Sequence, residues 1–321
     1  MGYLSDGEWH DEWDYNNAET GAFERDDSAF RNWITPDGTP GPTGTGGFTA
    51  ESGRYRLYIS LACPWAHRAN AARHLKGLTD AIELVVVHWL MKDGGWSFRE
   101  GECVTPDPLC GADYLHQVYT RAKPDYSGHV TVPLLWDTRT STIVNNESAD
   151  ILRMLGSAFD DCGANDRDLY PEACRAEIDG LNEQVYDAVN NGVYKAGFAS
   201  SQRAYEQAVM PLFSMLDQLE QRLENQQWLV GDQLTEADIR LWTTLIRFDP
   251  VYHLHFKCNI RRIADYPNLS AFTRRVYEMP GMAETVNFNH IRHHYFQSHE
   301  HINPTGIVPV GPNPLIPGGT A

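Results

Sequence analysis

The stretch Cys63-Pro64-Trp65-Ala66 most limits how this chain can fold. It stands between an apolar alternating run over 55–60, which predicts a β-strand, and an alanine-rich run over 65–76, which predicts an α-helix ending at Gly77. Pro64 suits the first helical position, because the N–H that proline lacks would be unpaired there. Cys63 is therefore expected at or beside the N-cap, facing free backbone N–H groups and the positive end of the helix dipole.

A thiol in such a position loses its proton readily, and the thiolate is the reactive form. We therefore expect Cys63 to be the nucleophile of an enzyme; the alternative is a buried structural cysteine. The six cysteines are too sparse and irregular for a disulfide framework, and Ala66 stands where a CxxC enzyme would hold its second thiol. For Cys103 and Cys110 we favour free thiols over a disulfide between them.

Composition narrows the possible partners and location. A hydrophobic content of 42% indicates a globular chain, and a formal net charge of −17 argues against nucleic acid or an anionic membrane as partner. The sequence has no apolar run of about 18 residues, as a membrane-spanning helix requires, and its start lacks the features of a signal peptide. We expect a cytoplasmic protein. The acid-rich, lysine-poor composition fits either a halophilic source or plain solubility.

The chain is long enough for two domains. Its start is acidic and aromatic, with Trp13 and Tyr15 among the rings, and we expect these aromatic side chains to pack on the body of the protein. The predicted parts are an extension over 1–50, a domain of strands and helices over 51–156 with an inserted loop over 90–129, a linker over 157–171, an all-helical domain over 172–290 and a tail over 291–321.

Local patterns predict several elements inside these parts. The strands are expected over 82–89, 132–136 and 142–144, the last two joined by a hairpin-like turn. In the helical half, an apolar stripe runs through 201–225, where Pro211 should kink the helix or mark a boundary. Thr235 and Asp238 form a capping-box pattern that opens the next helix.

A mixed α/β half with a cysteine at its first strand–helix junction, followed by an all-helical half, resembles a glutathione transferase. That resemblance implies a thioredoxin-like domain followed by a helical bundle domain. Four motifs, within a resemblance that runs over roughly residues 30–300, narrow it to the omega-like Xi class, the glutathionyl-hydroquinone reductases. They are Cys63-Pro64-Trp65-Ala66-His67-Arg68, Asp93-Gly94-Gly95-Trp96-Ser97-Phe98, Thr131-Val132-Pro133-Leu134-Leu135-Trp136-Asp137 and Thr142-Ile143-Val144-Asn145-Asn146-Glu147-Ser148.

The resemblance implies a glutathione site and a homodimer formed through the helical domain. Val132-Pro133 resembles the cis-proline turn that pairs with the backbone of the thiol tripeptide, and Glu147-Ser148 resembles the pair that takes its γ-glutamyl end. Trp96 would stack on the peptide, although it could also simply anchor a long loop. Glu147 could instead only stabilise a helix dipole.

One position departs from the family. His129 stands before Thr131-Val132-Pro133, where the family usually has an arginine. A permanent cation that could grip a carboxylate is thereby replaced by a group that is mostly neutral at neutral pH. The site is therefore expected to bind the glycine end of glutathione less firmly. The shorter thiol γ-glutamylcysteine is a second expected co-substrate.

The resemblance also implies three tyrosines that line a hydroquinone pocket, and the matching positions are Tyr194, Tyr252 and Tyr295. From the residues alone, a core or rim tyrosine is the simpler interpretation. Several histidines, His253, His255, His290, His293 and His294, match no standard zinc spacing, and no GxGxxG or Walker pattern occurs. We expect neither a metal nor a nucleotide.

The predicted function is that of a glutathionyl-hydroquinone reductase whose partners are small thiols and quinone conjugates. Cys63 would remove the glutathionyl group through a mixed disulfide that a second thiol resolves. One alternative is a broader omega-like thiol transferase or dehydroascorbate reductase. Another is a non-catalytic binding module that keeps the transferase fold.

Overall fold

The computed structural model describes residues 2–11, 19–24, 26–314 and 316, and these form two compact units. Trp13 and Tyr15 of the predicted extension lie outside the described residues, as do 315 and 317–321 of the predicted tail. The first unit contains residues 26–168 and 284–294 with the described residues of 1–13. The second contains residues 169–283 with the described residues of 14–25 and 295–321. The domain boundaries drawn from the sequence remain predictions.

The first unit is built on a four-stranded sheet of order β4-β3-β6-β7. Strands β3 and β4 are parallel, and β6 and β7 form an antiparallel hairpin that pairs with β3 through β6. The predicted strand–helix–strand and strand–turn–strand patterns are thus confirmed. The strands span Tyr55–Ile59 (β3), Ile82–Val86 (β4), Leu134–Asp137 (β6) and Thr142–Asn145 (β7).

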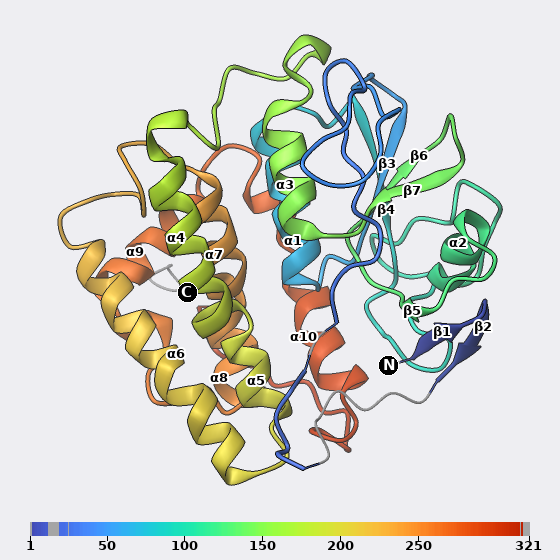
Figure 1. Ribbon diagram of the computed structural model, residues 1–321. Coiled ribbons are helices and arrows are strands. Elements are labelled where there is room, and N and C mark those ends of the chain that lie inside the picture. Colours follow the sequence, from blue (N-terminus) through green and yellow to red (C-terminus); the bar gives the residue numbers. More distant parts are fainter. Residues whose placement is uncertain (1, 12–18, 25, 315, 317–321) are drawn as a thin grey trace. The chain divides into compact units, whose positions relative to one another are not determined.

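Helices α1 (Pro64–Leu75) and α3 (Ser148–Ser157) pack side by side on one face of this sheet (Figure 1). Helix α1 is buried on almost every side, and its alanines let it lie close to both the sheet and α3. It ends as predicted at Gly77, whose φ of +72° is the left-handed conformation that follows many helices. The thioredoxin-like half of the predicted fold is confirmed.

A second, small sheet joins the start of the chain to the insert over 90–129. Its order is β2-β1-β5, with β1 at Tyr3–Ser5, β2 at Glu8–His10 and β5 at Gly128–His129. The insert also holds helix α2 (Leu115–Ala122), which was not predicted because the sequence over 90–129 shows no firm pattern. The strand β5 has two residues and pairs with β1 across more than a hundred positions, which no local pattern can reveal.

The second unit is helical, as predicted. Helix α6 continues through Pro211, so the helix boundary considered at that position is absent. Pro211 removes only one backbone donor, and the apolar face of the helix still packs on α5. Helix α10 covers 291–298, where a tail was expected. The helices of this unit are α4 (Arg175–Val185), α5 (Gly192–Phe198), α6 (Gln202–Arg222), α7 (Glu236–Arg247), α8 (His253–His255) and α9 (Pro267–Tyr277). Helix α10 (Phe288–Ser298) belongs to the first unit up to His294 and to the second unit from Tyr295.

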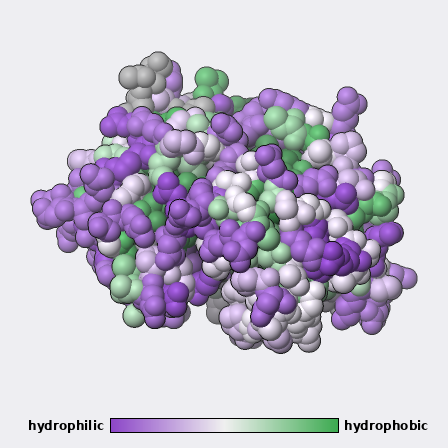
Figure 2. Space-filling view, turned by 90° about the horizontal axis from the view of Figure 1, so that it is seen from above, coloured by the Kyte–Doolittle hydropathy of each residue, from purple (hydrophilic) through white to green (hydrophobic). Residues whose placement is uncertain are grey.

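The surface agrees with the acidic composition. Figure 2 shows a face on which hydrophilic residues predominate and apolar residues are scattered between them. Large exposed apolar side chains, such as Met210, Leu254 and Val310, are few among the described residues. No helix in that part of the chain is long and apolar enough to cross a bilayer.

A candidate thiol site and a buried tyrosine cluster

Cys63 is the N-cap of helix α1, as predicted. Its backbone is extended, Pro64 follows at the first helical position, and Sγ accepts a hydrogen bond from the N–H of Ala66 at 3.5 Å. The same sulfur lies 3.6 Å from the carbonyl oxygen of Val132, to which the thiol donates. Cys63 is partly exposed, so its sulfur is not sealed in the core. A partly exposed sulfur that caps a helix is well placed to ionise and to react.

The other five cysteines do not combine partial exposure with a side chain that caps a helix. All six cysteines lie in the described part of the chain, and none of them forms a disulfide. Cys258 is fully buried, and burial raises the pKa of its thiol strongly. Burial, and next a hydrogen bond to Asp107, raise the pKa of Cys110. Cys174 also precedes a helix, α4, but its side chain makes no capping hydrogen bond.

The segment beside Cys63 is fixed by a buried tyrosine. The Val132–Pro133 peptide bond is cis, as the resemblance implied. The hydroxyl of Tyr119 donates to the carbonyl of Thr131 at 2.8 Å and accepts from the N–H of Thr131 at 3.2 Å. It also accepts from Nδ2 of Asn146 at 3.2 Å, so one hydroxyl ties the Val132 turn to the residue before Glu147.

Glu147 and Ser148 lie together at the start of α3. Glu147 is its N-cap, and Oε1 accepts from the N–H of Ala149 at 3.0 Å and from the hydroxyl of Ser148 at 3.3 Å. The buried guanidinium of Arg68, on α1, lies 3.4 Å from the Ser148 hydroxyl. Glu147 therefore stabilises the start of the helix, which was the alternative role considered for it. These hydrogen bonds hold its carboxylate in one orientation, and the residue remains partly exposed.

His129 and Trp96 are the remaining residues predicted to bind the thiol co-substrate. Nε2 of His129 lies 3.1 Å from a carboxylate oxygen of Asp26. Trp96 is 7% exposed, and its ring stacks on His294 of α10 with the ring centres 5.0 Å apart. This is the packing of a loop anchor, the alternative considered for Trp96, and its role toward a thiol stays a prediction.

The three predicted tyrosines meet in the second unit. The hydroxyls of Tyr194 and Tyr295 are 2.5 Å apart, and those of Tyr252 and Tyr295 are 3.0 Å apart. Tyr295 is thus the centre of a chain of three hydroxyls, and we call these residues the tyrosine cluster. They come from α5, from the π-helical turn Phe248–Tyr252 and from α10.

The tyrosine cluster is buried and apolar around its hydroxyls. Tyr252 and Tyr295 are at most 1% exposed, and the ring of Phe256 packs against both. Burial raises the pKa of Tyr252 and Tyr295 well above the usual value, while the charge of Arg247 acts in the opposite direction. These phenols therefore remain protonated at neutral pH and can donate hydrogen bonds.

Sequence reasoning missed several polar residues of these sites. Ser28 donates to Oε2 of Glu147 at 2.9 Å, and Asp26 pairs with His129. Arg247 is fully buried at the end of α7, near the tyrosine cluster. The partners of Ser28 and Asp26 are more than a hundred positions away, so no spacing rule could find them. For Arg247 the available signal was a charged residue that directly follows the apolar pair Leu245-Ile246.

The histidines do not gather into a metal site. In the part of the chain that the structure describes, no three His, Cys, Asp or Glu side chains are grouped to hold a metal ion. His255 and His299 form a buried pair with ring nitrogens 3.1 Å apart, and His290 bonds to the carbonyl of Glu102. The expected lack of a metal remains a prediction.

Comparisons with known proteins identify the family. Residues 62–158 match the model of the glutathione S-transferase N-terminal domain, and residues 202–275 that of the C-terminal domain. Glutathionyl-hydroquinone reductase YqjG of Escherichia coli is 58% identical over 313 residues, 97% of this chain and 95% of the relative. Glutathionyl-hydroquinone reductase PcpF of Sphingobium chlorophenolicum is 51% identical over 320 residues, 100% of this chain and 99% of the relative.

Solved structures agree with these relatives. The glutathione-bound structure of YqjG superposes with a TM-score of 0.90 at 56% identity, covering 97% of this chain and 96% of that one. The glutathione S-transferase Xi of Phanerochaete chrysosporium superposes with a TM-score of 0.86 at 53% identity, covering 92% and 99%. The chain therefore belongs to the glutathionyl-hydroquinone reductases, the Xi class of the glutathione transferases.

Proposed function

We propose that this chain is a glutathionyl-hydroquinone reductase in which Cys63 is the nucleophile. The observation that carries the proposal is identity of 58% and 51%, over nearly the whole chain, to two reductases of that name. The capped, partly exposed sulfur of Cys63 supports it, because that chemistry needs a single reactive thiolate.

In the first step the Cys63 thiolate attacks the sulfur of the glutathionyl group. The new S–S bond forms as the C–S bond to the ring breaks, and its electron pair goes to the ring carbon, which takes up a proton. Hydroquinone leaves, and the enzyme holds a mixed disulfide. In the second step the thiolate of another glutathione attacks that disulfide, releasing Cys63 and oxidised glutathione. Neither step requires a metal or a nucleotide.

We assign the thiol to the residues around Cys63 in the first unit. The backbone of Val132, before Pro133, would pair with the peptide of the thiol. Glu147 and Ser148 would take the α-amino group of the γ-glutamyl end, since a fixed carboxylate attracts an ammonium. Trp96 and His129 would lie along the rest of the thiol, which is glutathione or γ-glutamylcysteine.

We assign the hydroquinone to the tyrosine cluster. When the C–S bond breaks, negative charge develops on the ring and its oxygens, and phenol hydroxyls that donate hydrogen bonds stabilise it. In the tyrosine cluster the Tyr295 hydroxyl has two hydroxyl neighbours, so a proton given up at one end can be replaced from the next.

Replacing Tyr295 with phenylalanine tests this assignment. The substitution removes the central hydroxyl and both hydrogen bonds, so we expect kcat for glutathionyl-hydroquinone to fall by about 10- to 100-fold. Tyr252→Phe removes one of those bonds and should cost less. In the exchange reaction with the mixed disulfide of glutathione and mercaptoethanol, the leaving group is a thiolate and no charge develops on a ring. The tyrosine variants should therefore catalyse that exchange at the wild-type rate. Equal losses in both reactions would refute the assignment.

The proposed function itself is tested by offering the substrates side by side. Wild type and Cys63→Ala are assayed with glutathionyl-hydroquinone, dehydroascorbate and a glutathione mixed disulfide, each with glutathione and with γ-glutamylcysteine. We expect glutathionyl-hydroquinone to be preferred and the variant to be inactive. A preference for dehydroascorbate or the mixed disulfide would favour the broader omega-like transferase instead.

Assembly and location complete the proposal. We propose a homodimer formed through the helical domain, acting in the cytoplasm on small thiols and quinone conjugates, without nucleic acid or membrane partners. The net charge of −17 supports the exclusion of anionic polymers and surfaces. Sedimentation velocity at micromolar concentration tests the dimer.

A further inference from the structure

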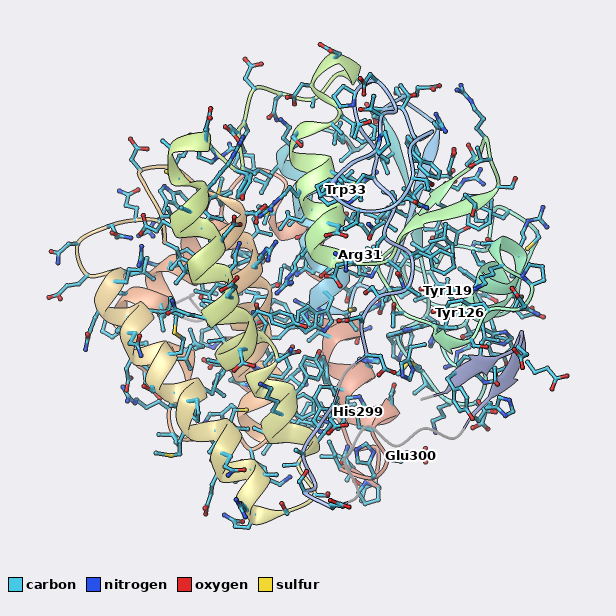
Figure 3. All side chains as sticks on the ribbon, viewed as in Figure 1. Arg31, Trp33, Tyr119, Tyr126, His299 and Glu300 are labelled. Atoms are coloured by element: carbon cyan, nitrogen blue, oxygen red, sulfur yellow. The ribbon has the colours of Figure 1, made fainter. Side chains whose placement is uncertain are left out.

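Residues 26–31, here called the strap, run beside the candidate thiol site within the first unit. The end of the strap at 30–31 is firmly anchored. Phe30 and Asn146 exchange two hydrogen bonds, of 3.0 and 3.1 Å, and the guanidinium of Arg31 binds both carboxylate oxygens of Asp150 on α3. Figure 3 shows Arg31 beside that helix. The strap is thus fixed to the same turn and helix start that carry Glu147.

The other end of the strap contacts two residues assigned to the thiol. The hydroxyl of Ser28 donates to Oε2 of Glu147 at 2.9 Å, and Oδ2 of Asp26 lies 3.1 Å from Nε2 of His129. Glu147 is assigned to the amino end of the thiol and His129 to its far end. A stretch of three residues therefore reaches the residues assigned to both ends.

The charge of the Asp26–His129 pair matters for what binds at the far end. Histidine at position 129 does not present the permanent positive charge that a guanidinium would present to a carboxylate. Here the pair carries no net charge when the imidazole is protonated and a net charge of −1 when it is neutral. In neither state does it offer a net positive charge to an incoming carboxylate.

We propose that Asp26 is a specificity-determining residue, which makes the site favour γ-glutamyl thiols without a carboxylate at the end facing His129. In the same strap, Ser28 is a positioning residue that orients Glu147 for the amino end shared by all such thiols. The proposal rests on the proposed function, because it takes Glu147 and His129 as the two ends of the thiol site. Glutathione still binds, but its glycine carboxylate gains little there.

Equilibrium binding tests the proposal without turnover. The probes are S-methylglutathione, whose thioether cannot exchange with Cys63, and the same compound with its glycine carboxylate amidated; calorimetry gives both dissociation constants. Asp26→Asn should lower the dissociation constant of the probe with the free carboxylate by about two- to fivefold, the range of exposed charge pairs. The dissociation constant of the amidated probe should stay unchanged. The control is Asp27→Asn, which removes the same charge from the neighbouring exposed residue and should leave the ratio of the two constants unchanged.

Ser28→Ala provides the second measurement. It should weaken both probes equally, by about three- to tenfold, because the amino end is common to them. The proposal is overturned if Asp26→Asn leaves the ratio unchanged, or if Asp27→Asn changes it as much. An unchanged ratio in an enzyme that still reduces glutathionyl-hydroquinone refutes only the role of Asp26. A ratio that shifts as expected in a protein without that activity refutes the proposed function and leaves the role of Asp26 standing.

Discussion

Cys63→Ser is expected to lower glutathionyl-hydroquinone reduction by at least about a thousandfold, as the loss of other catalytic nucleophiles does. A hydroxyl cannot form the mixed disulfide on which both steps depend. The variant should nevertheless fold normally, because serine is among the best N-cap residues and its oxygen can accept the N–H of Ala66 as the sulfur does. An unchanged melting temperature together with lost turnover would assign the loss to chemistry.

Two controls sharpen this result. Cys63→Ala should be equally inactive but also less stable by about 0.5–2 kcal/mol, because it removes the cap. Cys174→Ser makes the same exchange at another residue that precedes a helix, and it should keep full activity. Turnover within tenfold of wild type in Cys63→Ser would contradict the mechanism.

Alkylation kinetics separate an enzyme from a binding module. A helix N-terminus favours the thiolate, so iodoacetamide should modify Cys63 at pH values where ordinary thiols, with a pKa of about 8.5, are protonated. Cys174 makes no capping bond and serves as the internal reference. If both thiols reacted with the same pH dependence, the reactive thiolate would lack support and the module would be favoured.

The parts of the fold that were predictable have local causes. The Cys63 cap follows from a strand pattern, a proline and an alanine-rich run that are adjacent in sequence. The capping box at Thr235 and Asp238 is likewise contained in four residues, and the structure has it as predicted. In such places neighbouring residues decide the conformation, so a single sequence is sufficient.

The parts that were missed depend on distant partners. Strand β5 exists because β1 lies beside it. The last part of α10 falls in the segment over 291–321, whose prolines all follow the end of the helix. The tyrosine cluster joins three elements far apart in sequence, and only the resemblance to a family suggested it. Ser28 and Asp26 had no signal, because a single serine or aspartate in an acidic segment is ordinary.

Asp238→Ala is expected to destabilise the helical unit by about 3–5 kcal/mol, because buried donors lose their acceptor. Asp238 is fully buried. Its carboxylate accepts from the N–H of Leu229 at 2.8 Å, the N–H of Thr235 at 2.7 Å and the hydroxyl of Thr235 at 3.1 Å. It thus joins the start of α7 to the preceding turn. Urea unfolding at pH 7 measures the loss, and Asp232→Ala, which removes an exposed carboxylate nearby, should change the stability by less than about 0.5 kcal/mol.

The pH dependence of Asp238→Asn adds a second measurement. Burial raises the pKa of Asp238 to about 6, above the 3.8 of an unfolded aspartate. The folded state therefore binds this proton more tightly than the unfolded state. Protonation of Asp238 stabilises the folded wild type at low pH, and this stabilisation is lost as pH rises from about 4 to about 6. Asparagine has no such titration, and its single oxygen can accept at most two of the three donors. Wild type should thus exceed Asp238→Asn in stability by more at pH 4 than at pH 7. A constant difference, or a loss below about 1 kcal/mol in Asp238→Ala, would show that the capping box does not hold α7 in place.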